Sequence, residues 1–239
     1  MSKLTEAIKK CNNIVFFGGA GVSIASGIPD FRSADGIYSE KGTYSPEEIL
    51  SHGFFFSHTK EFYKFYREKM LYPDAKPNVV HYVLAELEKK GKLAAVITQN
   101  IDGLHKAAGS NKVFELHGTV HSNYCTKCGK HYGIEKILST KGIPYCECGG
   151  VIKPDVVLYG EALDTYMLEM ANAYACAADM LIVGGTSLSV FPAASLVNNY
   201  VGNNLVLINK TPTSADKYAD ILIHDDIAAV FEEIGKDLN

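Results

Sequence analysis

Polar side chains follow two apolar, strand-like runs of this chain, at the points where the runs end. The first run leads into Gln99, Asn100 and Asp102, and the second leads into His117. Groups at the carboxyl ends of strands in an open α/β sheet project into the ligand crevice, so we expect these side chains to converge there. A carboxylate and an imidazole can move protons near neutral pH. The sequence therefore predicts a reaction centre at one edge of a sheet.

A glycine-rich turn follows the earliest apolar run. Gly19, Ala20 and Gly21 lie where a strand should turn into a helix, and glycine lets the backbone bring free N–H groups close to a pyrophosphate. The third glycine of the usual G-x-G-x-x-G pattern is replaced by Ile24. No acidic residue stands convincingly about twenty residues further on to hold a ribose. We therefore predict a variant nucleotide site and not a dehydrogenase fingerprint.

A short charged and aromatic segment, Asp30-Phe31-Arg32, lies just beyond this turn. Its side chains suit a flexible cover over a ligand that carries charge and a planar ring. The alternative is a surface loop in which the aspartate only caps a turn.

Four of the six cysteines, Cys125, Cys128, Cys146 and Cys148, lie close together in the sequence. The first pair has the spacing of a zinc knuckle, and the gap to the second pair is typical of a zinc ribbon. The second pair is one residue shorter than usual, so its local backbone must differ. Four protein thiols leave water no open position, and we therefore predict one structural zinc, with free thiols as the alternative.

The composition limits the class of protein. A chain of 239 residues that is 47% hydrophobic and 21% charged can bury a large core and is typical of soluble globular proteins. The formal net charge is −4, and like charges form no long blocks, so nucleic acid or an anionic membrane is not favoured as a partner. No apolar stretch is long enough to span a bilayer, and we expect a cytoplasmic protein.

Apolar runs that alternate with helical periodicity predict the elements that position these groups. Most runs are continuous, as expected when helices cover both faces of a parallel sheet. The expected strands are Asn13–Phe17, Leu93–Thr98, Val113–Leu116, Asp155–Tyr159, Asp179–Gly184, Asn204–Asn209 and Asp220–His224. The expected helices include residues 80–87, 163–177 and 228–238. The alternation predicts an α/β fold with a doubly wound parallel sheet.

Two segments interrupt this alternation. One carries an aromatic stripe at helical spacing, with Phe62, Phe65 and Tyr66, which is more typical of core than of a ligand site. The other holds the cysteine cluster. We expect both to be insertions that form one small module. The expected division is a sheet domain of residues 1–32, 78–118 and 154–239, a helical insertion of residues 33–77 and a zinc-binding insertion of residues 119–153.

The motifs, taken in order from Phe16 to Asp226, resemble those of the sirtuin family, and of its compact bacterial, undifferentiated subgroup in particular. The matching motifs are Gly19-Ala20-Gly21-Val22-Ser23, Gly27-Ile28-Pro29-Asp30-Phe31-Arg32, Thr98-Gln99-Asn100-Ile101-Asp102, His117-Gly118, the four cysteines, Pro154-Asp155-Val156-Val157-Leu158-Tyr159-Gly160-Glu161 and Gly185-Thr186-Ser187-Leu188.

The resemblance implies a Rossmann-type NAD-binding domain with a small zinc-binding and helical module. It implies an NAD-dependent protein-lysine deacetylase that acts on acetylated lysine in proteins or peptides and yields nicotinamide, deacylated lysine and O-acetyl-ADP-ribose. NAD is then the co-substrate, zinc the structural metal, and a monomer is expected. Subtypes that prefer succinyl or malonyl groups carry a tyrosine and an arginine three residues apart. Here Tyr38 has no such arginine, so acetyl is the expected group.

The resemblance also assigns roles to residues of this chain. His117 would be the general base, and Asn100 and Asp102 would hold the leaving nicotinamide. The implied cofactor-binding residues are Gly19, Ala20, Gly21, Ile28, Asp30, Phe31, Arg32, Gln99, Asn100, Ile101, Asp102, His117, Gly185, Thr186, Ser187, Asn209, Lys210 and Asp226. The implied substrate-binding residues, which would pair with the peptide by strand addition, are Val157, Leu158, Tyr159, Gly160 and Glu161.

Two other functions stay open on the sequence. A protein ADP-ribosyltransferase would share the loss of nicotinamide and differ only in the acceptor. A non-catalytic sensor of NAD or ADP-ribose would need no base, so the combination of Asn100, Asp102 and His117 weighs against it.

Overall fold

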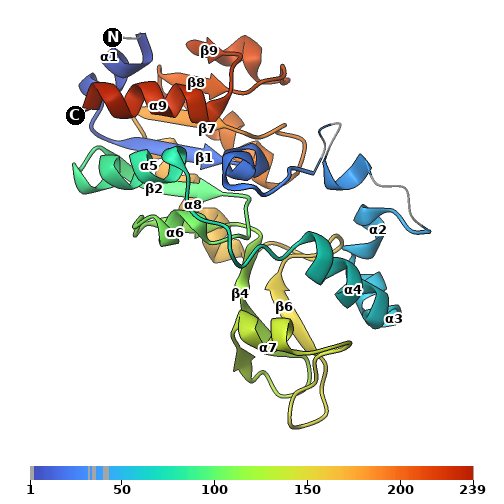
Figure 1. Ribbon diagram of the computed structural model, residues 1–239. Helices are drawn as coiled ribbons and strands as arrows, with labels where there is room; N and C mark the ends of the chain where they lie inside the picture. Colours follow the sequence, from blue (N-terminus) through green and yellow to red (C-terminus); the bar gives the residue numbers. More distant parts are fainter. Residues whose placement is uncertain (1–2, 32, 34–35, 40–42, 239) are drawn as a thin grey trace.

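Six of the apolar runs form one parallel sheet in the computed structural model, which describes residues 3–31, 33, 36–39 and 43–238 (Figure 1). The sheet consists of β1 (Ile14–Gly18), β2 (Leu93–Thr98), β3 (Val113–Glu115), β7 (Met180–Gly184), β8 (Leu205–Ile208) and β9 (Ile221–Ile223). The strand order is β3-β2-β1-β7-β8-β9, and every neighbouring pair is parallel. The order reverses between β1 and β7, which makes this pair the topological switch point of a doubly wound sheet. The predicted fold class is confirmed.

Alternate residues of β1 face two separate hydrophobic cores. Ile14 and Phe16 belong to one core, and Val15 and Phe17 belong to the other. The first core is closed by α1 (Lys3–Lys10), α5 (Val79–Lys89) and α9 (Ile227–Leu238). The second core is closed by α8 (Thr165–Ala177) and the 3₁₀ helix η3 (Ala193–Asn199). Burial on both faces explains why the strand sequences are continuously apolar.

Helix α5 begins at a capping residue that also reaches the glycine turn. The Asn78 side chain accepts the Val80 N–H at 2.9 Å, and the His81 ring accepts the Asn78 N–H at 3.2 Å, so the first turn has its donors satisfied. The Asn78 amide also donates to the Val22 carbonyl at 2.8 Å. The start of α5 is therefore fixed against the segment that follows β1.

A second, antiparallel sheet lies apart from the first and consists of β5 (His131–Tyr132), β4 (Gly118–Cys125) and β6 (Ile152–Val156). The predicted parallel strand Asp155–Tyr159 is wrong, because the strand ends at Val156 and pairs with β4. An apolar run shows that a strand is buried but not which sheet it joins. Strand β4 was not predicted, because it mixes polar and apolar residues and buries both kinds, as Val120 and Asn123 show.

Four more helices pack with this small sheet, below the parallel sheet in Figure 1. They are α2 (Pro46–Ile49), α3 (His52–Ser57), α4 (Thr59–Lys69) and α7 (Ile134–Ser139). The aromatic stripe is core, as predicted, since Phe62 and Tyr66 are fully buried in one cluster with Ile137 and Ile152. The predicted division into domains stays a prediction, and its boundary after residue 153 falls inside β6.

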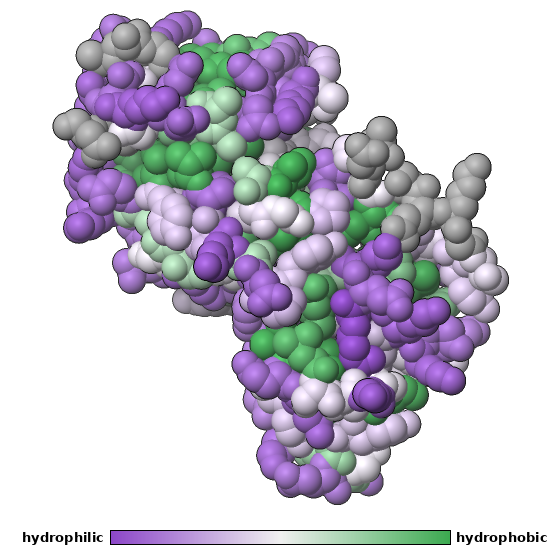
Figure 2. Space-filling model, viewed as in Figure 1, coloured by the Kyte–Doolittle hydropathy of each residue, from purple (hydrophilic) through white to green (hydrophobic). Residues whose placement is uncertain are grey.

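Short helices complete the chain: η1 (Ala20–Ser26), η2 (Ile37–Ser39), α6 (Leu104–Ala107) and η4 (Asp216–Tyr218). On the face shown in Figure 2, hydrophobic residues come to the surface where the two parts of the molecule meet. Within the described ranges, no helix has both the length and the apolar character needed to cross a membrane.

Candidate active site

The carboxyl ends of four strands lie side by side at the switch point. Gly18 pairs in register with Thr98 on one side and with Gly184 on the other, and Gly184 pairs with Ile208. The segments that follow these strands therefore leave the sheet together, as required for a ligand crevice. A cavity of about 950 Å³ opens there, at the upper end of the range for small-molecule sites.

Most of the predicted site residues share the wall of this cavity. Those that line it are Ala20, Gly21, Ile28, Asp30, Phe31, Gln99, Asn100, Ile101, Asp102, His117, Val157, Leu158, Tyr159, Gly160, Glu161, Gly185, Thr186, Ser187, Asn209, Lys210 and Asp226. Gly19 is buried and is not one of the lining residues, and Arg32 lies outside the described residues. One surface thus brings together segments that are up to about two hundred positions apart in the sequence.

The glycine turn lies in contact with the segment that follows β7. It enters the 3₁₀ helix η1, and the N–H groups of Gly19 and Gly21 donate to the carbonyls of Gly184 and Gly185 at 3.2 and 2.8 Å. The N–H groups of these two glycines are therefore used inside the fold, and the nucleotide site at this turn stays a prediction. A Cβ on Gly21 would lie 2.7 Å from the Gly185 Cα, and Gly185 itself has φ of 62°. The glycines let two chain segments cross in contact.

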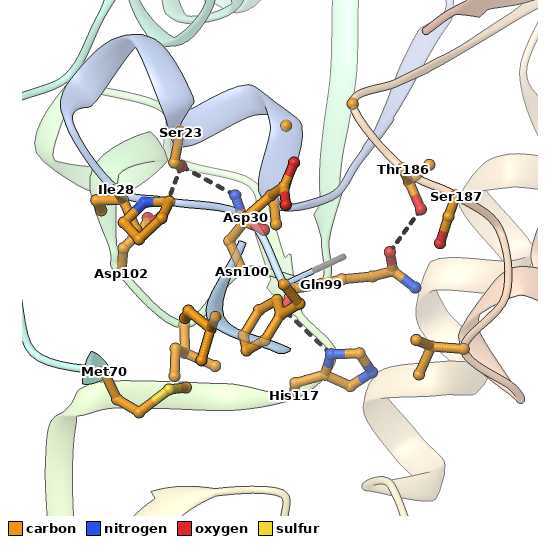
Figure 3. Close-up of a pocket in the computed structure, with 18 of the residues that line it drawn as sticks. Ser23, Ile28, Asp30, Met70, Gln99, Asn100, Asp102, His117, Thr186 and Ser187 are labelled. Atoms are coloured by element: carbon orange, nitrogen blue, oxygen red, sulfur yellow. Dashed lines mark hydrogen bonds between the residues drawn. The ribbon is translucent and has the colours of Figure 1, made fainter. Parts of the chain in front are cut away.

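A buried hydrogen-bond network joins Asn100 and Asp102 through Ser23 (Figure 3). Asn100 Nδ2 donates to Ser23 Oγ at 3.0 Å, and Ser23 Oγ donates to Asp102 Oδ2 at 2.7 Å. The other carboxylate oxygen accepts the Leu104 N–H at 2.9 Å. Ser23 is 1% exposed, and no role was predicted for it although it lies within the glycine motif. A hydroxyl facing two polar strand ends is the signal that could have found it.

Gln99 extends to the opposite side of the cavity (Figure 3). Its Oε1 accepts the Thr186 hydroxyl at 2.8 Å, and the Thr186 N–H donates to Asn209 Oδ1 at 2.9 Å. The amide nitrogens of Gln99 and Asn209 are buried, and neither has a partner among the described residues. Buried donors are nearly always bonded in native proteins, so these two groups fit a polar ligand such as a dinucleotide.

The His117 ring is oriented by the segment that carries Gln99. Its Nδ1 lies 3.0 Å from the Gln99 carbonyl oxygen, which can only accept, so Nδ1 carries the hydrogen. Burial lowers the pKa of His117, and the hydrogen bond to Gln99 opposes this shift more weakly. The ring is therefore neutral at pH 7, and Nε2, to which no described residue bonds, keeps its lone pair. This is the state that a general base requires.

Two aspartates of the predicted site also form hydrogen bonds that stabilise the local fold. Asp226 caps α9 by accepting the Ala228 N–H at 2.8 Å, and it forms an ion pair with Lys210 at 2.7 Å. Its hydrogen bond from Lys210 holds the pKa of Asp226 below its ordinary value. Asp30 accepts the Ser33 N–H at 2.8 Å, so the capping interpretation and the cavity position both hold for it.

His105 does not reach the cavity. Its ring is 2% exposed and lies 4.6 Å from the His81 ring, measured between centroids. Neither nitrogen of His105 has a hydrogen-bond partner among the described residues, and the same is true of His81 Nε2. Burial lowers the pKa of His81 to about 4 and that of His105 to about 3. The structure makes the pair a neutral part of the core.

The four clustered thiols fit one zinc ion. All four Sγ atoms lie within 4.8 Å of one another, with 3.5 Å between Cys125 and Cys148 and 3.6 Å between Cys128 and Cys146. Zn–S bonds of about 2.3 Å in a tetrahedron separate sulfur atoms by about 3.8 Å. The shortened second pair therefore reaches the same point as the first. Tyr132 adds a phenol that donates to Cys146 Sγ at 3.0 Å.

Known proteins are similar to this chain in both sequence and fold. The pattern of the Sir2 family matches residues 19–192. The NAD-dependent protein deacetylase of Clostridium perfringens (strain 13 / Type A) is 55% identical over 238 residues, which cover 98% of each chain. The protein of the same name from Staphylococcus epidermidis is 48% identical, and the match covers 98% of this chain and 96% of that one.

Solved structures agree with the sequence matches. A structure of Sir2 with p53 peptide and NAD+ has a TM-score of 0.89 at 39% identity, covering 99% of this chain and 98% of that one. A structure of Sir2 bound to acetylated peptide has a TM-score of 0.88 at 38% identity, with the same coverage. Sequence, fold and the position of the cavity lead to one conclusion: this chain belongs to the Sir2 family.

Proposed function

We propose that this protein is an NAD-dependent protein-lysine deacetylase. The observation that carries the proposal is the neutral His117, with Nδ1 bonded to the Gln99 carbonyl and Nε2 available in the wall of the same cavity as the Ser23–Asn100–Asp102 network. The names of the full-length relatives support the same activity. The products are nicotinamide, the free lysine and O-acetyl-ADP-ribose.

The two sides of the cavity suit the two ends of NAD. When bound, NAD supplies a leaving nicotinamide and the ribose that receives the acetyl group. Asn100, whose amide nitrogen is held by Ser23, would accept from the nicotinamide amide through its unbonded oxygen, beside Asp102. The unpartnered amide nitrogens of Gln99 and Asn209 would donate to the ribose and phosphate oxygens on the other side. His117 would take a proton from a ribose hydroxyl at Nε2.

The segment Val157–Glu161 would hold the acetylated peptide by strand addition. One of its edges is occupied, since Tyr159 exchanges backbone hydrogen bonds with Leu50 and His52. Within the described part of the chain, no hydrogen bond engages the Val157 carbonyl or the Gly160 N–H, and both residues line the cavity. These groups are the ones available to a peptide backbone.

The four clustered thiols support a proposal for the location of the protein. Four thiols must stay reduced to bind zinc, and the cytoplasm keeps thiols reduced. We therefore place the protein in the cytoplasm. The expected monomeric state stays a prediction.

The test is an assay of one acetylated peptide with and without NAD, analysed by mass spectrometry. Wild type should release O-acetyl-ADP-ribose, and His117→Ala should lose this product while keeping the far-ultraviolet circular dichroism of wild type. Undiminished turnover in the variant would exclude His117 as the base. Label from NAD that stays on protein would identify a transferase, and binding without nicotinamide release would identify a sensor.

A further inference from the structure

The segment Val157–Glu161 is held in place from two sides by backbone hydrogen bonds. Its first N–H donates to the His117 carbonyl at 3.0 Å. On the other side, Tyr159 donates to the Leu50 carbonyl and accepts from the His52 N–H, both at 2.9 Å. A third attachment is a buried ion pair that takes no part in the chemistry proposed above.

The ion pair starts from a buried lysine in β6, shortly before the segment. The Lys153 side chain is 4% exposed, and its ammonium donates to the carbonyls of Pro154 at 3.2 Å and Val156 at 3.0 Å and to Glu161 Oε2 at 3.0 Å. An ammonium has three N–H donors, and all three are used here. A buried charge is tolerated only when it is paired and bonded in this way, so the local backbone is built around Lys153.

Glu161 closes the other end of the segment. Its Oε2 also accepts the Leu158 N–H at 2.9 Å, and its Oε1 lies 2.9 Å from Nδ1 of His52, at the start of α3. Burial alone would raise the pKa of the Glu161 carboxyl, but the hydrogen bonds from Leu158, His52 and Lys153 hold it below its ordinary value. The carboxylate is therefore ionised and paired at neutral pH.

The two side chains hold the backbone on either side of one residue. Lys153 binds the carbonyl of Val156, and Glu161 binds the N–H of Leu158. Between them stands Val157, whose N–H is bonded to the His117 carbonyl and whose own carbonyl faces no described partner. We propose that Lys153 and Glu161 are positioning residues that fix the Val157 carbonyl to accept an N–H of the acetyl-lysine peptide. The proposal rests on the function proposed above.

The test separates the binding of peptide from the binding of NAD. Lys153→Met keeps the length and apolar stem of the side chain and removes the ammonium. Steady-state kinetics are measured with peptide varied at saturating NAD, and with NAD varied at saturating peptide. We expect KM for the peptide to rise about tenfold or more, because a misplaced contact group weakens binding steeply, while KM for NAD stays within about twofold.

The matched control is Lys106→Met. Lys106 also pairs with a glutamate, with 2.5 Å between its Nζ and Glu115 Oε2. This pair joins α6 to β3 of the parallel sheet, and neither residue lines the cavity. This variant should keep both wild-type KM values. Equal increases of both KM values in the Lys153 variant, or an unchanged KM for the peptide, would overturn the positioning role.

Glu161→Gln provides the second variant if Lys153→Met does not fold. The glutamine oxygen still accepts the Leu158 N–H while the charge that pairs with Lys153 is gone. A wild-type KM for the peptide in this variant would refute the proposal, and a selective increase would support it. A wild-type protein without NAD-dependent deacetylation would refute the proposed function itself, which is a separate result.

Discussion

The buried histidine pair should make this protein unusually sensitive to mild acid. His81 is 0% and His105 2% exposed, and burial lowers their pKa values to about 4 and about 3. In the unfolded chain each imidazole titrates near pH 6.5. Between pH 6.5 and about 4, the unfolded state therefore binds two protons that the folded state excludes, and stability falls as the pH falls.

The size of the effect follows from the window between these pKa values. Each proton bound only by the unfolded chain costs about 1.4 kcal/mol per pH unit, so each histidine costs about 2 kcal/mol at pH 5. The pair then removes about 4 kcal/mol, a large part of the 5–15 kcal/mol typical of a folded domain. Above pH 7 both rings are neutral in both states, and the stability should no longer depend on them.

His105→Leu isolates the contribution of one ring. The substitution removes no hydrogen bond from a described residue, because neither ring nitrogen has a partner. Urea unfolding is followed by circular dichroism at pH 7.5, 6 and 5, since the chain has no tryptophan. Between pH 6 and 5, the variant should lose about 1.2 kcal/mol less than wild type, because the unfolded imidazole is already partly protonated at pH 6. Protonation of zinc thiols and of other groups acts on both proteins and cancels in the difference.

The exposed His131, replaced by leucine in the same way, is the matched control, because its ring lies in solvent. This variant should follow the wild-type pH dependence. Parallel losses of stability in wild type and in His105→Leu would refute the reasoning, since they would mean that the buried ring exchanges no proton on unfolding.

Four further outcomes are expected. Ser23→Ala breaks the buried amide–hydroxyl–carboxylate network and should lower kcat/KM for NAD about 10- to 100-fold; an unchanged value would exclude the network from the reaction. Gly118→Ala places a Cβ against a backbone carbonyl at φ of 76° and should lower the unfolding free energy by about 3 kcal/mol. The control Gly142→Ala, at φ of 85° in open space, should lower it by about 1 kcal/mol. Equal losses in the two variants would contradict the clash. Because burial lowers the pKa of His117, kcat/KM should fall only below about pH 6.5, and a fall beginning at higher pH would exclude this ring as the titrating base. Tyr132→Phe removes the phenol that bonds a zinc-site thiol and should weaken zinc binding about 10- to 100-fold in chelator competition, and full retention would contradict that role.

Local patterns predicted the parts of the fold that depend on local information. The strands β1, β2, β7 and β8 were found because burial on both faces requires continuous apolar residues. The same criterion failed in the small sheet, where the strand at residues 155–159 was misassigned and β4 was missed. A strand of a small antiparallel sheet with one solvated face has a mixed composition, and its partner is chosen by tertiary packing.

The function of the glycines could not be derived from their own neighbourhood. Gly21 needs its missing side chain because Gly185, far along the chain, crosses it in contact. The sequence pattern could only connect these glycines with the phosphate of a nucleotide. The contact depends on the placing of β1 beside β7, which the strand order of the whole sheet decides. The position of the turn at the ligand crevice was predicted, but the physical reason for glycine was not.

The segment after β2 organises the candidate site because its consecutive side chains point in opposite directions. In an extended backbone, neighbouring side chains alternate between two faces. Gln99 thus bonds Thr186 in the segment after β7, and Asn100 bonds Ser23 in η1 on the other side of the cavity, although the two residues are adjacent (Figure 3). The backbone carbonyl between these side chains orients His117. One short segment at the switch point can therefore hold two ends of a ligand apart and set the base between them, which explains why the polar residues of this segment are so closely spaced.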